Sequence, residues 1–277
     1  MSPSRPATHL GYDAEALASS PYAPYYRPAL APLAEPLRAA LAVGALATEL
    51  LPPVSEAHRL QDEGYHAVET GYALTPEGGA RLAVLTPMPG VAPAMWDWWF
   101  AWHGSEALRY KLWHPQAHLD VGWRDGAGER PNYVGRVSEV EEYVGSERVR
   151  ASVGFVAPSA MGLDERRLAE RGEVAICARL GMVIAGVPLY SGWLLHQLRP
   201  VPGGTEMRSR FWLGGAEVRP FGWDNRLGAA LGRLAARLKP VQPAQAQALM
   251  VHDAQEMGHL ATILPALHAA FGPGSRA

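Results

Sequence analysis

VHDAQEMGHL, residues 251–260, belongs to a stretch whose pattern predicts a long C-terminal helix from about Pro243 to Phe271, interrupted near Pro265. In such a helix His252 and Glu256 lie one turn apart on the same face. The apolar residues of that face are Leu249, Leu260 and Ile263. This pattern predicts a buried face, and the fold must therefore supply something that covers it.

An imidazole and a carboxylate on a buried face need an explanation. A buried carboxylate costs several kcal/mol unless it is paired or bound to a cation. The spacing of His252 and Glu256 lets both side chains reach one metal ion from adjacent turns. The alternative is a surface pair that makes an ordinary helical contact. His259, two turns beyond His252, is expected to pack or to support a ligand rather than to bind metal.

The chain before this helix reads as a succession of hairpins. Residues 66–74 and 80–88 flank TPEGG, and residues 191–199 and 206–214 bracket PVPGG. Residues 132–145 and 148–156 have the alternation of two further strands. Hairpins followed by one long helix predict an α+β fold, in which a curved antiparallel sheet grips the helix and leaves a cavity between them.

Two helices interrupt the strands, and the first part of the chain differs from the rest. PAMWDWWFAWHG (93–104) predicts one helix, and Ser105 is expected to cap a second at EALRYKLWH (106–114). Residues 1–64 are rich in Ala and Pro and predict an irregular arm with a helix. We expect this arm to pack on the main domain, residues 65–277, or on a second subunit.

Composition excludes several classes of protein. The 277 residues are 48% hydrophobic, which is ample for a core, and the formal net charge of −2 leaves no basic footprint for nucleic acid or membrane. The single cysteine, Cys177, excludes a disulfide framework and is expected to be a buried thiol. No stretch has the length of a membrane span or of a signal peptide core, so a cytoplasmic protein with a small substrate is expected.

The helical pair needs further ligands from elsewhere in the chain. LWHPQAH, residues 112–118, offers His114 and His118 just beyond a helix end. Glu142 is the other candidate, because strand alternation places it between two inward-facing valines. A solvent-facing strand carboxylate is the alternative reading of Glu142.

Three more residues are candidates for chemistry in the cavity. His196 shares a strand face with two leucines and is expected to point inward, although a hydrogen-bonded core histidine is the alternative. Tyr110 and His103 lie on the two helices before residue 114 and can reach the same space. No nucleophile elbow, P-loop or dinucleotide fingerprint accompanies them.

Long blocks of the chain resemble a known family. In order, they are MWDWWFAWHGSEALRYKLWHPQAH, VEEYVG, LLHQLRPVPGGTEMRSRFWLG and HDAQEMGHL. The chain is similar to the 2,4-diacetylphloroglucinol hydrolase family, with its phloretin hydrolase relatives, over about residues 65–270. The resemblance implies a Bet v 1-like helix-grip fold, a homodimer, and a zinc-dependent hydrolase that cleaves the carbon–carbon bond between an acyl group and a phloroglucinol-type ring.

The resemblance also assigns residues. It implies that Zn²⁺ is bound by His118, Glu142, His252 and Glu256. The catalytic residues implied or expected beside this site are His196, as proton shuttle, Tyr110 and, as a weaker candidate, His103.

The substrate site departs from the family pattern at two positions. Tyr110 matches a substrate-contacting tyrosine of the family, but Phe211 stands where the family has a second one, and Val121 stands in place of a family asparagine. Both replacements remove hydrogen-bonding groups, which leaves the identity of the acyl phenol open.

Two other functions remain open at this point. Helix-grip proteins also carry hydrophobic polyketides or phenols without transforming them, because a fold alone does not decide a function. A metal hydrolase of esters or amides would share the metal ligands and differ in its substrate.

Overall fold

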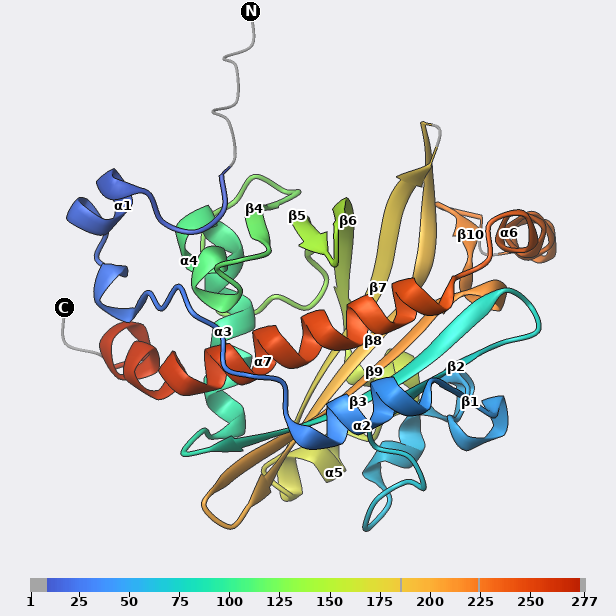
Figure 1. Cartoon of the computed structure of the whole chain (residues 1–277), viewed down its shortest axis with the longest axis horizontal. Helices are drawn as coiled ribbons and strands as arrows, with labels where there is room; N and C mark the ends of the chain where they lie inside the picture. The colour runs from blue at the N-terminus through green and yellow to red at the C-terminus, as the bar shows by residue number, and fades with distance from the viewer. Residues whose placement is uncertain (1–8, 185, 224, 275–277) are drawn as a thin grey trace, which may run out of the picture.

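The computed structural model describes residues 9–184, 186–223 and 225–274, and within them the strands form one large, curved sheet (Figure 1). The strands are β1 (Ala45–Leu46), β2 (Gly71–Leu74), β3 (Gly79–Pro89), β4 (His118–Trp123), β5 (Val137–Val144), β6 (Glu147–Val156), β7 (Val174–Ile184), β8 (Val187–Val201), β9 (Gly204–Gly214) and β10 (Arg219–Pro220). Their spatial order is β1-β2-β3-β9-β8-β7-β6-β5-β4, and β10 pairs with β8. The neighbours are antiparallel except for β1 and β2, which pair in parallel. The predicted antiparallel sheet is therefore mixed at one edge.

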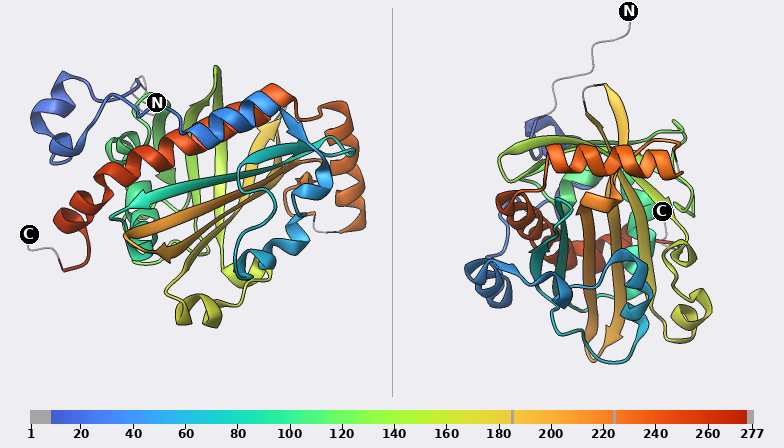
Figure 2. Two further views of the ribbon diagram at one scale, coloured as in Figure 1. Left: turned by 60° about the horizontal axis from the view of Figure 1, so that its bottom comes forward. Right: turned by 90° about the vertical axis from the view of Figure 1, so that its right-hand side faces the viewer.

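The long helix α7 (Pro243–Phe271) lies across one face of the sheet, which curves around it (Figures 1 and 2). This confirms the predicted α+β helix-grip fold. The face of α7 toward the sheet is fully buried, and its apolar members are Met250, Met257, Leu260 and Leu264. Burying each such side chain contributes about 1.5–3 kcal/mol, so the contact of α7 with the sheet is a major source of stability.

The predicted interruption of α7 near Pro265 was wrong. The helix runs without a break through Pro265 to Phe271. Proline removes one backbone hydrogen bond from a helix interior, at a cost of about 3 kcal/mol. Leu264 and Leu267 are completely buried on either side of Pro265, and their packing holds the helical path.

The other helices are α1 (Ala14–Ser19), α2 (Glu35–Val43), α3 (Pro93–Trp102), α4 (Ala107–Trp113), α5 (Glu165–Glu170) and α6 (Arg226–Leu238). The expected helices at 93–104 and 106–114 correspond to α3 and α4. Ser105 does not cap α4, because Glu106 occupies the cap position and the Ser105 hydroxyl accepts a hydrogen bond from Trp123 Nε1 at 3.2 Å. Our sequence reading did not assign α6, which follows β10 near the start of α7.

The N-terminal arm packs on its own chain. The Tyr12 hydroxyl donates to the Leu108 carbonyl at 2.7 Å, and the Tyr22 hydroxyl donates to Glu106 Oε2 at 3.0 Å. Tyr22 also packs edge-on against Trp102. These contacts join the arm to α3 and α4, while β1 adds its short strand to the sheet. The boundary at residue 64 and a role of the arm in dimerisation stay predictions.

Two smaller predictions concern burial and the membrane. Cys177 is a free thiol with 0% exposure on β7, as expected for a structural cysteine. Within the described chain, no helix has both the length and the apolar character needed to cross a bilayer.

Candidate metal centre

His118 begins β4 and is held in one orientation by Tyr110. Its ring stacks on the Tyr110 ring at a centroid distance of 3.7 Å, and its Nδ1 lies 2.9 Å from the Tyr110 carbonyl oxygen. A carbonyl only accepts hydrogen bonds, so Nδ1 carries the proton and Nε2 keeps its lone pair. Nε2 is buried and has no hydrogen-bond partner among the described residues. A buried lone pair held in one direction in this way is available to bind a metal ion.

The pairing of β4 with β5 brings Glu142 to His118. The two residues are direct partners in the strand register. Glu142 Oε2 lies 3.5 Å from His118 Nε2, and the Tyr110 hydroxyl donates a hydrogen bond to the same carboxylate oxygen. Tyr110 therefore positions both side chains, one through its backbone carbonyl and one through its hydroxyl.

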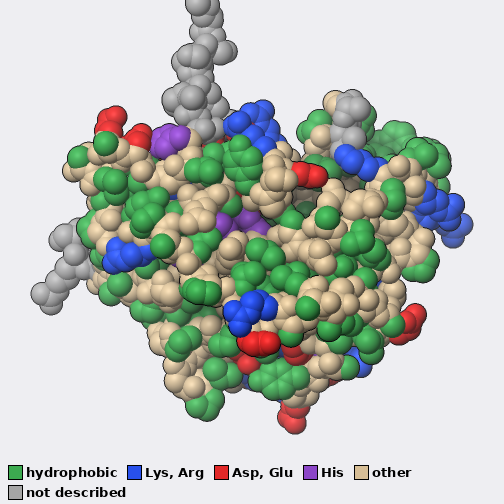
Figure 3. All heavy atoms as spheres, viewed as in Figure 1, with side chains coloured by type: hydrophobic (Ala, Val, Ile, Leu, Met, Phe, Trp, Pro, Cys, Tyr) green, Lys and Arg blue, Asp and Glu red, His purple; other side chains and the backbone are tan. Residues whose placement is uncertain are grey.

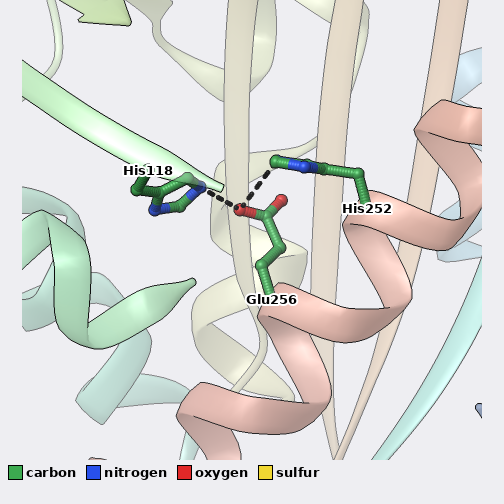
Figure 4. A group of neighbouring side chains, drawn as sticks. All are labelled: His118, His252 and Glu256. Carbon is green, nitrogen blue, oxygen red and sulfur yellow. Dashed lines mark ion pairs between the residues drawn. The ribbon is translucent and has the colours of Figure 1, made fainter. Parts of the chain in front are cut away.

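The helix α7 supplies the other two side chains of the group. Glu256 Oε2 lies 3.3 Å from His118 Nε2 and 3.7 Å from His252 Nε2, with the two rings on different sides of the carboxylate (Figure 4). His252 Nε2 is 3.9 Å from Glu142 Oε2. The potential ligand atoms of His118, His252 and Glu256 all lie within 4.8 Å of one another. The structure thus brings together all four residues that the resemblance implied as ligands.

Burial disfavours every charge in this cluster. It raises the pKa of the Glu142 carboxyl to about 7, against a smaller lowering by the Tyr110 hydrogen bond. Burial, with the nearby Asp253 and Glu142, raises the pKa of Glu256 well above its usual range. Burial also lowers the pKa of His252 to about 4, so the imidazoles are neutral at neutral pH. Neutral imidazoles offer nitrogen ligands to a divalent ion, and the two carboxylates offer oxygen ligands. The charge of a divalent ion would also balance the two buried carboxylates. The residues therefore fit a metal ion such as Zn²⁺.

His114 and His259 lie next to this group. The His114 ring stacks on the His252 ring at 5.0 Å, and burial lowers the pKa of His114 to about 3. His259 is 4% exposed on the same helix as His252. Neither belongs to the group of converging ligand atoms. Of the two histidines in residues 112–118, His118 is the one with a ring nitrogen within 3.5 Å of the Glu142 and Glu256 carboxylates.

A cavity of about 500 Å³ opens from the cluster between α7 and the sheet. Glu142, His252 and Glu256 form one part of its lining, and apolar strand residues form most of the rest. The predicted site residues that also line it are His103, Tyr110, His196 and Phe211. Val121 is buried on β4, and it is absent from the cavity lining that the described residues form.

His196 has a polar support that our sequence reading missed. Its Nδ1 lies 2.8 Å from Ser209 Oγ on β9 and 4.0 Å from Asp253 Oδ1 on α7. Asp253 is completely buried. Its position next to His252, on the helix face that also carries Met250 and Met257, is the signal in the sequence that could have identified it. Burial lowers the pKa of His196 to about 3.

Fold and site together define a class: a helix-grip protein whose apolar cavity contains a buried His–Glu cluster suited to a metal ion. The family model described as the DAPG hydrolase PhiG domain matches residues 50–269. The chain belongs to this family, as its long sequence blocks predicted.

Named relatives extend the match to most of the chain. A 2,4-diacetylphloroglucinol hydrolase of a Pseudomonas species is 29% identical over 93% of this chain and 90% of its own length. The phloretin hydrolase of Eubacterium ramulus is 30% identical over 90% of this chain and 89% of its own length. The expectation of a hydrolase agrees with both names.

Solved structures give weaker likenesses. Protein Ms6760 from Mycobacterium smegmatis is 12% identical, with a TM-score of 0.37 over 72% of this chain and 99% of its own. Major latex-like protein 151 from Panax ginseng is also 12% identical, with a TM-score of 0.33 over 63% of this chain and 97% of its own. With TM-scores this low, neither likeness carries a further argument.

Proposed function

We propose that this protein is a metal-dependent hydrolase of acylphloroglucinols, which cleaves the bond between the acyl carbon and the aromatic ring and releases a carboxylic acid. The relatives hydrolyse 2,4-diacetylphloroglucinol or phloretin, as their names state. The observation that carries the proposal is the convergence of His118, His252 and Glu256, of which His252 and Glu256 line the cavity. A carrier has no use for such a cluster, because its buried carboxylates cost stability.

The cavity suits an aromatic ligand. Its walls include Phe100, Trp113, Phe155 and Phe211, and Glu142 and His252 add polar groups to the lining. Aromatic and aliphatic walls with a few directed polar groups are typical of sites for small aromatic molecules. The relatives' substrates are aromatic rings that carry several hydroxyl groups and an acyl group. The ring suits the apolar walls, and the hydroxyl and acyl oxygens suit the polar groups.

We propose His118, Glu142, His252 and Glu256 as the metal ligands and Zn²⁺ as the ion. A divalent ion bound there would supply Lewis-acid polarisation of the acyl oxygen and would lower the pKa of water. Tyr110 holds the Glu142 carboxylate through its hydroxyl and the His118 ring through its carbonyl. In the proposed site Tyr110 therefore orients ligands, in addition to contacting a phenolic hydroxyl of the substrate.

The reaction must move one proton to the ring. Hydrolysis places the hydroxyl group of water on the acyl carbon and its remaining hydrogen on the ring carbon, while the electrons of the broken bond delocalise onto the phenolic oxygens. We assign the proton transfer to His196, which lines the cavity and is held through Nδ1 by Ser209. An imidazole in water titrates near neutral pH. Burial lowers the pKa of His196 to about 3, so we expect it to start neutral and to accept the proton before it donates it.

His103 and the two departures from the family shape the rest of the pocket. His103 Nδ1 lies 2.8 Å from the Trp99 carbonyl, which leaves Nε2 as the nitrogen able to contact a substrate hydroxyl. Phe211 presents an apolar ring to the cavity. We therefore propose that this pocket makes fewer hydrogen bonds to the acyl group of its substrate than the pockets of relatives that have tyrosine at this position. Val121 is retained only as a proposed indirect contact, since it does not line the cavity.

Replacing Glu256 with Gln tests the proposal. Gln keeps the shape of the side chain but removes the negative charge that would hold a divalent ion, so both zinc content and release of acid from diacetylphloroglucinol should fall by at least roughly tenfold. Glu139→Gln is the matched control, because Glu139 lies on β5 but is paired with Arg124 at the surface. Its zinc content and activity should equal those of the wild type.

The outcomes separate the competing functions. Full activity in a zinc-poor Glu256→Gln protein would contradict the proposed site. Tight binding of both phenols without release of acid, by zinc-loaded wild-type protein, would indicate a carrier. Hydrolysis of simple aryl esters but of neither acyl phenol would keep the metal centre and reassign the substrate to an ester.

A further inference from the structure

Helix α6 exposes its large apolar side chains and buries its small ones. Leu227, Leu231, Leu234 and Leu238 are 60%, 42%, 56% and 79% exposed. Their spacing of four, three and four residues places them in one stripe along the helix. In a soluble helix such a stripe normally faces the core, and exposed apolar stripes mark interaction sites.

The orientation of α6 is imposed by two glycines. A Cβ added to Gly232 would lie 1.7 Å from the Val218 carbonyl oxygen, and one added to Gly228 would lie 2.1 Å from the Trp223 carbonyl oxygen. Only glycine permits so close an approach of helix and backbone. Rotating the helix to bury the leucines would place large side chains against that backbone. The leucine stripe must therefore face outward.

A basic row accompanies the leucines. Arg226, Arg233 and Arg237 are exposed, their spacing of seven and four residues places them along one side of α6, and the sequence contains no acidic residue from 225 to 252. This concentration of positive charge contrasts with the formal net charge of −2 for the whole chain. Figure 3 shows hydrophobic side chains over α6, with Lys and Arg side chains beside them. An exposed helix that carries leucine and basic side chains but no acidic side chains is typical of helices that lie in the surface of an anionic bilayer.

The helix also borders the cavity. Ala235, Ala236 and Lys239 belong to the lining of the same cavity that Glu142, His252 and Glu256 line. Phe221 and Trp223, which precede α6, are 41% and 45% exposed and extend the apolar surface. Aromatic side chains of this kind favour the interfacial region of a bilayer.

We propose that α6 docks this protein on an anionic lipid surface, with the leucines among the acyl chains, the basic row on the lipid phosphates, and the part of the cavity that α6 lines toward the bilayer. Apolar ligands that partition into lipid would then enter the cavity along α6. The docking does not depend on the proposed hydrolysis, because it uses no residue of the His–Glu cluster. A second copy of the chain is a poorer occupant, since an antiparallel pair of α6 helices would set one arginine row against the same row of the other copy.

The proposal is tested by sedimentation of the full-length, zinc-loaded protein with vesicles. Vesicles of phosphatidylglycerol and phosphatidylcholine should bind the protein, vesicles of phosphatidylcholine alone should bind it at least roughly tenfold more weakly, and high salt should weaken the first interaction. A Leu231→Gln/Leu234→Gln variant should lose binding. Its matched control, Leu17→Gln/Leu50→Gln, removes two other exposed leucines and should bind as the wild type does.

A charge variant separates lipid docking from nonspecific adhesion. Arg233→Gln/Arg237→Gln should weaken binding to the anionic vesicles by roughly tenfold or more, while Arg130→Gln/Arg166→Gln, at exposed positions elsewhere, should change it little. Equal binding by the leucine variant and the wild type would overturn the proposal. A second result would also overturn it: the wild type does not bind anionic vesicles and is a dimer, while the leucine variant is a monomer. The leucine stripe would then be an interface between two copies of the chain. Circular dichroism and thermal unfolding are measured alongside to show that each variant is folded.

Discussion

At the scale of single residues, the decisive atom is Nε2 of His118. It is buried without a hydrogen-bond partner in the described part of the chain, and it lies 3.3 Å from Glu256 Oε2. The Tyr110 carbonyl fixes the proton on the opposite nitrogen, as a support for a metal-binding histidine does. His114 and His259 also have a buried ring nitrogen without a partner, and what distinguishes His118 is the pair of carboxylate oxygens within 3.5 Å of its Nε2.

His196→Ala tests the division of roles within the cavity. We expect zinc content to stay at the wild-type level, because His196 is not in the converging group, while kcat falls by about 10²–10⁴-fold through loss of proton transfer. The measurements are zinc per chain and steady-state kinetics on one preparation. His58→Ala, which removes a histidine outside the cavity, is the control. An unchanged kcat would remove the proposed role of His196.

The sequence predicted the residues of α7 better than it predicted their partners. Helical spacing was sufficient to pair His252 with Glu256, because neighbours at four residues meet in any helix. The meeting of His118 with Glu142 depends on the register of β4 and β5, which local pattern does not determine. Asp253 and Ser209 were missed for a related reason, since their contact with His196 joins α7, β9 and β8.

At the scale of elements, β9 separates two environments. Ser209 and Phe211 point to the cavity side, whereas Arg208 and Arg210 are buried on the opposite side, where Glu69 accepts hydrogen bonds from both guanidinium groups. Burial alone would raise the pKa of Glu69, but the two arginines outweigh it and lower that pKa to about 2. This ion cluster fixes the segment before β2 against the back of the sheet.

Glu69→Gln should destabilise the fold in a pH-dependent way. Removing the carboxylate leaves two buried guanidinium groups without their counter-charge, at a cost of about 3 kcal/mol. Since the folded pKa is about 2 and the ordinary value is 4.5, the contribution of Glu69 is complete above pH 4.5 and is lost as the pH falls toward 2. Urea unfolding of wild type and variant across this range gives the difference. Glu170→Gln, at an exposed pair with Arg166, should cost less than about 0.5 kcal/mol, and an equal loss in both variants would refute the account.

The boundaries of helices and strands show where the sequence pattern alone does not predict the structure. The strand expected from His66 begins at Gly71, because residues before it are held by side-chain contacts such as Glu69 with the His66 backbone rather than by strand pairing. Helix α6 was not assigned, although its amphipathic pattern is present in the sequence. Pro265 is tolerated in α7 because the tertiary packing of α7 outweighs one lost hydrogen bond.

At the scale of the whole molecule, the metal is expected to contribute to stability. Without a cation, the raised pKa of Glu142, about 7, means that the folded state holds its proton more tightly than the unfolded chain does. Stability of the metal-free protein should therefore fall as the pH rises from 4.5 toward 7, whereas the lowered pKa of His252, about 4, gives the opposite trend below pH 6.5. Above pH 6.5 only the carboxylates contribute, and stability should decline.

A comparison of chelated and zinc-loaded protein by thermal unfolding tests this expectation. Between pH 6.5 and 8 the melting temperature of the chelated protein should decrease, and the difference between the two forms should widen, because bound metal keeps Glu142 and Glu256 ionised without penalty. The control is Glu256→Gln, whose melting temperature should respond little to zinc. Identical melting curves with and without zinc would show that no metal binds in the fold.

The central claim is that a metal ion held by His118, Glu142, His252 and Glu256 is required for cleavage of the acyl–ring bond. The most direct measurement is a zinc titration of chelator-treated protein in which bound zinc per chain and release of acetic acid from diacetylphloroglucinol are followed together. The account predicts that activity rises in proportion to bound zinc and saturates at about one ion per chain. Full activity before any zinc is added, or saturation with zinc without any release of acid, would contradict it.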